Sequence, residues 1–517
     1  MKGSHKNLIK ERKKFIAFDD LKRLIIENDF CTLCGACEAA CPIHAIKVTE
    51  KPDRLYDCSE HLDTCPICYD ICPHTDALLY EILRFVANAP HRREALGYYR
   101  RILLAQAANP AIREATKSGG VVNALLNFAL DQKMIDCAIT SKVSPSLAVK
   151  VKPLITLVPD DALSAVDSKV IPCAVAEAFG RAVFEYGKVH IAFVGIPCHV
   201  LALRKLEAWQ HKLIDSLEII IGLFCLWTFS LGRLLEHLLH EYGIAANEIT
   251  SVDLEGNEYV VSTRNNMLRI PILKVKSHIM NRCKTCVDFT SEFADLSVGG
   301  ATPLKDWSII IVRTERGENL LNLAVERKVL TVKEIGVEQE ALAHLINIST
   351  YKRNNALLEA KSMEKEGVKI PTAAEFYMKP TSIEISMLEE IKVEQIMTKK
   401  VIVLTPRMTV NDFFDKVAEH HHTGFPIIDE SNRLLGIVTL QDAMKVAKEK
   451  RSEVRLEEIC TKRLVTIFPG NSVAEALEKM DKHNVGRLLV VDEKNRDLLL
   501  GIITRSDIMH ALRTKLL

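Results

Sequence analysis

Eight cysteines concentrated in residues 31–72 constrain the fold of this 517-residue chain more than any other feature. The first four, with the proline that follows them, have the spacing C-x₂-C-x₂-C-x₃-C-P, and the second four repeat it in a longer form that also ends in proline. The two sets are Cys31, Cys34, Cys37 and Cys41, and Cys58, Cys65, Cys68 and Cys72. Thiolates at this spacing predict two 4Fe–4S clusters, and therefore single-electron chemistry.

The repeated motif also predicts how the two clusters share their ligands. In bacterial ferredoxins the fourth cysteine of one run binds the other cluster, so Cys72 joins the first three cysteines and Cys41 joins the second set. The long spacer between Cys58 and Cys65 makes the second site the less regular one. Zinc is the alternative, because tetrahedral Cys₄ sites also use C-x₂-C pairs. The C-x₂-C-x₃-C-P ending that both runs share favours iron.

Charge and hydropathy argue against several other classes of protein. The 68 Lys+Arg and 67 Asp+Glu nearly cancel, so no nucleic-acid partner is expected. No stretch reaches the roughly 20 apolar residues of a membrane span, and no apolar run follows the basic start as it does in a signal peptide. We therefore expect a cytoplasmic location. There, 15 cysteines indicate metal or redox sites rather than disulfides.

Alternating β-rich and helical stretches predict an α/β domain in the middle of the chain. We expect a buried strand over 190–195, a loop over 196–199 that carries Cys198, and a second strand over 217–224 that ends at Cys225. Ligands in open α/β sheets lie beyond the carboxyl ends of the strands. Both thiols should therefore lie in the same crevice.

A later C-x₂-C pair, Cys283 and Cys286, brings this set to four thiols. Four thiolates are enough for a third 4Fe–4S cluster. The alternative is a redox disulfide between the two paired cysteines. The remaining cysteines, Cys137, Cys173 and Cys460, have no partner spacing and are expected to be small core residues.

A Ser-Gly-Gly turn precedes an apolar helix near the start of this domain. Ser118 is a good helix cap, and Gly119 and Gly120 let the backbone approach a ligand closely. Free N–H groups at a helix start bind anions such as the diphosphate of FAD. From these residues alone, an ordinary helix cap is the simpler interpretation.

Six motifs follow one another through this part of the chain. They are Ser118-Gly119-Gly120-Val121-Val122, Gly195-Ile196-Pro197-Cys198, Gly222-Leu223-Phe224-Cys225, Cys283-x₂-Cys286-x-Asp288-Phe289, Ala294-Asp295-Leu296-Ser297-Val298-Gly299, and Trp307-Ser308 with Val312-Arg313-Thr314-Glu315-Arg316-Gly317. In this order they resemble the coenzyme F-420 hydrogenase/dehydrogenase beta-subunit family, and the resemblance covers residues 29–345.

The resemblance implies an oxidoreductase with FAD beside a 4Fe–4S cluster. In that family the flavin exchanges hydride with the substrate coenzyme F-420, and a redox partner subunit is expected. It assigns the two strand-end cysteines and the C-x₂-C pair to the cluster of the core, and the turn at 118–120 to the flavin site. A flavin can divide the electron pair of a hydride between single-electron clusters, which suits this combination.

The sequence departs from the family at two positions. His199 replaces the usual glutamine after Pro-Cys, and is either a proton donor beside the core cluster or a satisfied loop histidine. Gly300, followed by Ala301, replaces the usual aspartate, so the flavin pocket has lost a carboxylate. The alternative function is therefore a non-enzymatic electron-transfer or scaffold subunit that has lost its flavin site.

An internal repeat lies beyond a charged linker predicted over 346–391. Each unit has a helix, two strands and a closing helix. The matching strand ends are Gly436-Ile437-Val438-Thr439-x₂-Asp442 and Gly501-Ile502-Ile503-Thr504-x₂-Asp507. The repeat resembles a tandem pair of CBS modules over 392–513.

Such pairs bind adenosine ligands (AMP, ATP or S-adenosylmethionine), and they commonly associate, so a homodimer is possible. The resemblance assigns Thr439 and Thr504 to phosphate, and Asp442 and Asp507 to the ribose. The alternative is structural, because Thr-x-x-Asp is also a helix capping box. A regulatory energy sensor is thus a third functional hypothesis. The run His420–His422 is either a metal site or a solvated helix end.

The sequence thus predicts a multidomain α/β and α+β protein. Its parts are a ferredoxin-like domain with two 4Fe–4S clusters (29–75), an α/β flavin-binding core (76–345), a linker (346–391) and a tandem CBS pair of βαββα units (392–513).

Overall fold

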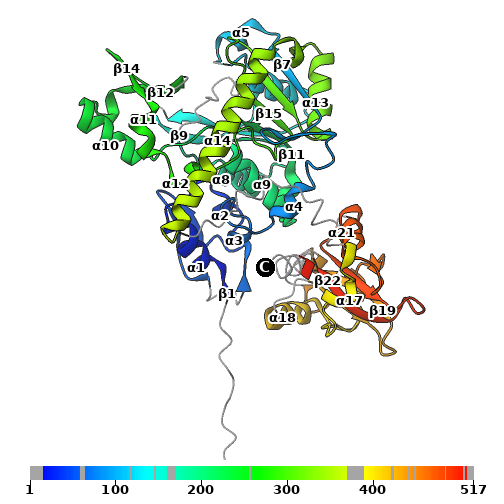
Figure 1. Cartoon of the computed structure of the whole chain (residues 1–517). Coiled ribbons are helices and arrows are strands. Elements are labelled where there is room, and N and C mark those ends of the chain that lie inside the picture. Colours follow the sequence, from blue (N-terminus) through cyan, green and yellow to red (C-terminus); the bar gives the residue numbers. More distant parts are fainter. Residues whose placement is uncertain are drawn as a thin grey trace, which may run out of the picture. The chain divides into compact units, whose positions relative to one another are not determined.

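The computed structural model describes most of the chain. The described residues are 15–58, 64–116, 118–144, 147–159, 171–255, 258–368, 389–420, 424–439, 442–443, 445–446, 450–483, 485–504 and 507–508. The chain forms two compact units, Met1–Met378 and Lys379–Leu517 (Figure 1). No described helix is long and apolar enough to cross a membrane.

Short elements wound around the eight clustered cysteines open the first unit. They are β1 (Phe15–Ile16), α1 (Ala17–Leu21), the π-helix Lys22–Ile26, α2 (Ala36–Ala39), β2 (Ile46–Val48), β3 (Pro52–Arg54), β4 (Thr64–Cys65) and α3 (Ile67–Asp70). Phe18, Ile25 and Phe30 are buried together with several of the thiols. Because few apolar side chains are buried here, the core of this segment is small. Bound clusters would therefore supply part of its packing.

An eight-stranded sheet forms the larger part of the first unit, in the order β17-β7-β16-β15-β11-β10-β8-β9. The strands are β7 (Arg101–Ala107), β8 (Cys137–Ser144), β9 (Leu147–Thr156), β10 (Ile191–Gly195), β11 (Leu217–Leu223), β15 (Leu296–Gly300), β16 (Ser308–Val312) and β17 (Leu330–Glu334). Every residue of β10 and β16 is buried, as expected for apolar strands covered on both faces.

Helices cover both faces of this sheet. They are α6 (Val121–Asp131) and α13 (Glu315–Glu326) on one face, and α8 (Val175–Phe184) and α9 (Pro197–Ala208) on the other. The alternation along β10 shows the two faces, because Phe193 packs with α8 and α9 whereas Val194 packs with α6 and α13. This is the α/β core that the sequence predicts.

Smaller elements complete the first unit. They are α4 (Leu79–Leu83), β5 (His91–Arg93), β6 (Gly97–Tyr99), α5 (Pro110–Glu114), α10 (Leu231–Tyr242), α11 (Ile272–Val275), α12 (Asn281–Lys284) and the antiparallel sheet β12 (Ile249–Glu255), β13 (Glu258–Thr263) and β14 (Met267–Pro271).

The strand directions bring several predicted site residues to one edge of the main sheet. β8, β10, β11 and β15 are parallel, and β16 is antiparallel to both β15 and β7. The carboxyl ends of β10, β11, β15 and β7 therefore share that edge. Cys198 and Cys225 follow two of these ends, as predicted.

A long helix, α14 (Gln339–Lys365), runs across the first unit (Figure 1). Its side chains at Ser349, Lys352 and Ala356 are buried, and Met363 near its end packs on the cysteine-rich segment. The linker predicted over 346–391 is therefore wrong at its start, because its first twenty residues belong to a packed helix. Residues 369–388 lie outside the described part.

The second unit contains the two predicted repeats. The first has α17 (Val393–Ile396), α18 (Val410–His420), β18 (Gly424–Ile428) and β19 (Leu434–Thr439). The second has α20 (Leu456–Ile459), β20 (Thr466–Ile467), α21 (Val473–Lys482), β21 (Arg487–Val491) and β22 (Leu499–Thr504). α18 packs on β18 and β19 in one apolar core, and α21 packs on β21 and β22 in another, which confirms the repeat. The short helices are exchanged, because Val393 of α17 packs in the core of the second repeat and Leu456 of α20 packs in that of the first.

Candidate functional site

The twelve cysteines predicted as ligands lie in three groups of four. We call them the proximal, distal and core groups. They are respectively Cys31, Cys34, Cys37 and Cys72; Cys41, Cys58, Cys65 and Cys68; and Cys198, Cys225, Cys283 and Cys286. The exchange of Cys41 and Cys72 between the two runs is the one that the motif predicts.

The proximal group lies between the other two. Cys68 of the distal group is close enough to Cys72 to interact with it electrostatically. On the other side, Cys34 interacts in the same way with Cys198 of the core group. The fold thus arranges three groups of thiols in series, from the N-terminal segment to the edge of the main sheet.

Burial raises the pKa of several of these thiols. It raises the pKa of Cys34 to about 12, with a further contribution from Cys72. Burial and neighbouring thiols also raise the pKa of Cys198 well above its ordinary value. A cationic centre reverses this preference, because it binds the thiolate. All 15 cysteines are free, so the disulfide predicted as an alternative at Cys283–Cys286 is absent.

The spacing of the thiols distinguishes a cluster from a single ion. A zinc ion binds four thiolates at roughly 2.3 Å, so its ligands crowd around one point. Within the described ranges, no three His, Cys, Asp or Glu side chains are close enough for that. Instead, the four thiols of the proximal group line one hollow and those of the core group line another. In a 4Fe–4S cluster each thiolate binds a different iron, which this wider spacing fits.

Two buried lysines test the fit independently. Nζ of Lys205 donates to the carbonyl oxygen of Cys72 at 2.7 Å, and Nζ of Lys352 donates to that of Cys225 at 2.7 Å. Neither lysine has a carboxylate within ion-pair distance among the described residues. Burial alone would lower the pKa of Lys352, but the nearby thiols of Cys286 and Cys225 keep it raised. A buried cation needs an anion close by, and an iron–sulfide centre with four thiolates is negatively charged.

Backbone and hydroxyl groups also point at the sulfurs. The N–H of Leu33 lies 3.4 Å from Sγ of Cys31, and that of Ala45 lies 3.2 Å from Sγ of Cys41. Hydrogen bonds to cluster sulfurs are a general feature of iron–sulfur sites.

The sequence predicts that Cys198 lies in a loop. Cys198 lies instead in the first turn of α9. The helix begins at Pro197, which is favoured at this position. Nδ1 of His199 accepts the N–H of Ile196 at 3.4 Å, and burial lowers the pKa of His199 to about 4. His199 is therefore neutral and caps the helix. The proton-donor interpretation is not favoured.

The Ser-Gly-Gly turn leads into α6 with both glycines at φ of +68°. A Cβ on Gly119 would lie 2.6 Å from the carbonyl oxygen of Asp306. The helix is capped by the backbone of Gly120, without a side-chain hydrogen bond, so the prediction of Ser118 as cap is wrong. A Cβ on Gly300 would meet only Oγ of Ser118, at 3.7 Å. A carboxylate at position 300, as the family usually has, would therefore lie beside this turn.

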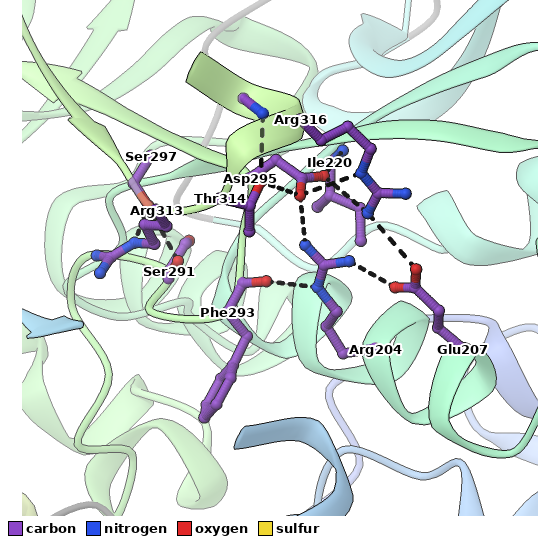
Figure 2. Close-up of polar contacts among 11 residues, drawn as sticks. Arg204, Glu207, Ile220, Ser291, Phe293, Asp295, Ser297, Arg313, Thr314 and Arg316 are labelled. Atoms are coloured by element: carbon purple, nitrogen blue, oxygen red, sulfur yellow. Dashed lines mark hydrogen bonds and ion pairs between the residues drawn. The ribbon is translucent and has the colours of Figure 1, made fainter. Parts of the chain in front are cut away.

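Asp295, from the fifth motif, joins α9 and β11, which lead to core thiols, to the start of α13 (Figure 2). It accepts hydrogen bonds from Nη2 of Arg204 on α9 at 2.8 Å and from the N–H of Ile220 on β11 at 2.7 Å. Oγ1 of Thr314, at the start of α13, donates at 2.6 Å. Burial alone would raise the pKa of Asp295, but Arg204 and then Arg316 outweigh it and hold the pKa below its ordinary value.

The predicted nucleotide residues of the second unit contact each other. Oγ1 of Thr439 donates to Asp442 at 2.7 Å, and Oγ1 of Thr504 donates to Asp507 at 2.7 Å. This is the geometry of a helix cap, repeated in both modules. For the predicted histidine run, Nε2 of His420 lies 3.6 Å from Glu419, and His421 and His422 lie outside the described residues.

Sequence reasoning missed the polar groups around the thiols. Arg282 directly precedes Cys283 and His74 follows Cys72-Pro73, so their positions beside the motifs were a usable signal. Lys205 and Lys352 have no such signal, because only the tertiary fold brings them to the cysteines.

Four family models match five parts of the chain. The models described as coenzyme F-420 hydrogenase/dehydrogenase, beta subunit, match at residues 102–179 (N-term) and 189–338 (C terminus). A 4Fe–4S binding domain matches at 24–47, and CBS domains match at 393–449 and 456–514.

Individual relatives agree with these matches. The coenzyme F-420 hydrogenase subunit beta of Methanothermobacter thermautotrophicus is 25% identical over 53% of this chain and 99% of its own length. The protein of the same description from Methanococcus voltae is 27% identical, over 53% and 99% respectively. A chain of the F-420-reducing [NiFe] hydrogenase complex from Methanosarcina barkeri shares the fold. Its TM-score is 0.51 at 20% identity, and the match covers 54% of this chain and 99% of that one.

Proposed function

The chain belongs to the coenzyme F-420 hydrogenase/dehydrogenase beta-subunit family over residues 102–338, joined to a 4Fe–4S domain and a CBS pair. From this premise we propose that it is an iron–sulfur flavoprotein oxidoreductase that exchanges electrons with coenzyme F-420. A redox partner subunit would receive or supply them. The observation that carries the proposal is the series of three groups of thiols, which ends at the sheet edge with Cys198 and Cys225.

The twelve cysteines would hold three 4Fe–4S clusters. When bound, the clusters would carry single electrons, and FAD would exchange them for the hydride of the deazaflavin. The chain's own residues bury the sites and exclude water. Lys352 fixes the carbonyl groups of Cys225 and Asp288, at 2.7 and 2.6 Å, and so holds the two loops that carry core thiols.

The turn at Ser118, Gly119 and Gly120 would bind the flavin diphosphate. Two features support this assignment. No side chain caps the start of α6, and the start of a helix favours an anion. The two glycines, at positive φ and without Cβ, let a ligand approach the backbone closely.

A pair of glycine substitutions tests the flavin assignment. In Gly119→Ala the new methyl group would lie 2.6 Å from the carbonyl of Asp306, so the turn must shift. Gly187 has a similar φ of +59° with nothing near its Cβ position, so Gly187→Ala is the matched control for backbone strain. We expect anaerobically purified G119A to lose the flavin absorbance that G187A keeps. Equal flavin content in the two variants would count against the turn.

Reduced coenzyme F-420 tests the reaction itself. Added anaerobically to the full chain, it should bleach the flavin absorbance and then that of the clusters. A fully loaded protein that does not react would show that the electron donor is different.

A non-enzymatic subunit is the second candidate, and Gly300 favours it. This residue leaves open space beside Ser118 where the family has a carboxylate. Such a subunit would carry iron but no flavin. Flavin that remains bound through gel filtration would rule it out.

We further propose that the CBS pair binds an adenosine nucleotide, AMP or ATP, and regulates the redox unit. If the protein were purely a regulatory sensor, binding of the nucleotide to the CBS pair would be the only property it needed. The support is the repeated placement of Thr439 with Asp442 and of Thr504 with Asp507 at equivalent strand ends. Calorimetry with AMP and ATP tests the proposal, and no heat of binding from either would exclude it.

A further inference from the structure

A chain of hydrogen bonds connects Arg282 to the sulfur of Cys198. Nε of Arg282 donates to Nδ1 of His74 at 3.1 Å, and Nε2 of His74 lies 2.7 Å from Oγ1 of Thr32. Thr32 and Cys198 line the same hollow, where the hydroxyl of Thr32 faces the sulfur of Cys198 and favours its thiolate form. The exposed fractions of Arg282, His74 and Thr32 are only 7%, 5% and 4%. These three side chains are therefore largely shielded from water, whereas Cys198 is half-buried.

Donor and acceptor chemistry fixes the direction of these bonds. An arginine side chain has no acceptor, so Nδ1 of His74 must present its lone pair to Arg282. The hydrogen of the neutral ring is then on Nε2, which donates to Thr32. Thr32 has one hydroxyl hydrogen, and it remains available for the sulfur of Cys198. Every bond therefore points from the guanidinium toward the thiolate.

The same residues also touch the proximal group. The backbone N–H of His74 is hydrogen-bonded to Cys72, and the charge of Arg282 favours the thiolate of Cys72. Thr32 and His74 belong to the ferredoxin-like segment, whereas Arg282 belongs to the core, 208 residues from His74. The contacts thus bridge the two segments at the point where the proximal and core groups adjoin.

On the basis of the proposed function, we infer that Thr32, His74 and Arg282 are positioning residues that place a hydrogen bond on Cys198 and so raise the reduction potential of the core cluster. The physical reason is charge. Reduction adds an electron to an already anionic centre, so a donor aimed at a ligand sulfur stabilises the reduced form more than the oxidised form. In a dry, low-dielectric site this difference is larger than in water.

Thr228 provides an internal comparison. Its Oγ1 lies 3.0 Å from Sγ of Cys283, another thiol of the core group, and 3.4 Å from Sδ of Met280. It has no link to His74 in the contacts described above. A substitution there removes a hydrogen bond from the same cluster without affecting the contacts that begin at Arg282.

The experiment is a redox titration of the full chain, followed anaerobically by electron paramagnetic resonance. The core signal is the one that Cys225→Ser removes. We expect Thr32→Val to shift the equilibrium between reduced and oxidised core cluster about tenfold toward the oxidised form, which is about 59 mV for one electron. Thr32→Ser keeps the hydroxyl and should restore the wild-type value. Both variants should retain the full iron content.

Double substitutions separate this inference from simple packing. His74→Leu should lower the potential when made alone, have no further effect in Thr32→Val, and keep its whole effect in Thr228→Val. A Thr32→Val potential equal to wild type with the cluster present would overturn the inference, as would full additivity of Thr32→Val and His74→Leu.

If Thr32→Val does not assemble the core cluster, His74→Leu alone decides the matter. It leaves the hydroxyl beside Cys198 and removes only the link to Arg282, so an unchanged potential would refute the inference. Failure of the proposed function is visible separately, because the wild-type protein would then lack flavin or would not be reduced by coenzyme F-420.

Discussion

Replacement of Asp295 by asparagine is the sharpest test of how the fold positions the core thiols. Asparagine keeps the shape and one oxygen, which can still accept the N–H of Ile220. Its NH₂ group, however, faces the guanidinium of Arg204, whose exposed fraction is 0%, and donor then meets donor. Breaking a buried ion pair in this way costs about 3–5 kcal/mol. In the variant, Arg204 still pairs with Glu207. We therefore expect a loss in the free energy of unfolding at the lower end of this range, about 3 kcal/mol.

The assay uses the position of the tryptophans. All three, Trp209, Trp227 and Trp307, lie in the first unit, so their fluorescence in urea follows that unit alone. At an unchanged slope, the loss in free energy of unfolding is the midpoint shift multiplied by the slope. Arg316→Gln is the matched control. This arginine touches the same carboxylate but is 37% exposed, so its loss should cost at most about 1 kcal/mol.

The pH dependence has a definite sign. The pKa of Asp295 is held below its ordinary value, so its contribution is complete above about pH 4 and is lost as the pH falls through the folded-state pKa. The gap between wild type and Asp295→Asn should therefore be largest near neutral pH and shrink in acid. A neutral-pH gap below about 1 kcal/mol, or one equal to that of Arg316→Gln, would refute the reasoning.

Three further predictions follow from the sites. Cys225→Ser should reduce the iron content by about four atoms per chain, whereas Cys460→Ser should leave it unchanged, by metal analysis. Lys352→Met leaves two buried carbonyls without their donor, so it should destabilise the first unit by about 2–5 kcal/mol in the tryptophan assay. Asp442→Ala and Asp507→Ala should each weaken AMP or ATP binding at least about tenfold in calorimetry. A purely capping role would instead cost about 1 kcal/mol of stability with the affinity unchanged.

The grouping of the twelve cysteines in space could be predicted because local spacing determines much of it. The C-x₂-C-x₂-C-x₃-C-P run predicts that Cys41 and Cys72 exchange sites between the two groups. The structure has this arrangement. The strand-end rule likewise brought Cys198 and Cys225 together. These predictions hold because each depends on a few neighbouring residues or on a general property of parallel sheets.

The polar surroundings of the thiols could not be predicted in the same way. Lys352 stands in a run of polar residues in the middle of α14, which reads as a solvated surface, and only the tertiary fold buries it against Cys225. The start of the linker was predicted wrongly for the same reason, because only long-range packing shows that this stretch belongs to α14. The helical start at Pro197 was a local signal that the prediction of a loop overlooked.

Iron and flavin content per chain, measured together on anaerobically purified protein, test the central claim most directly. Three four-iron clusters and one flavin predict about twelve iron atoms and one FAD per chain. A colourless preparation that contains zinc in place of iron would contradict the account.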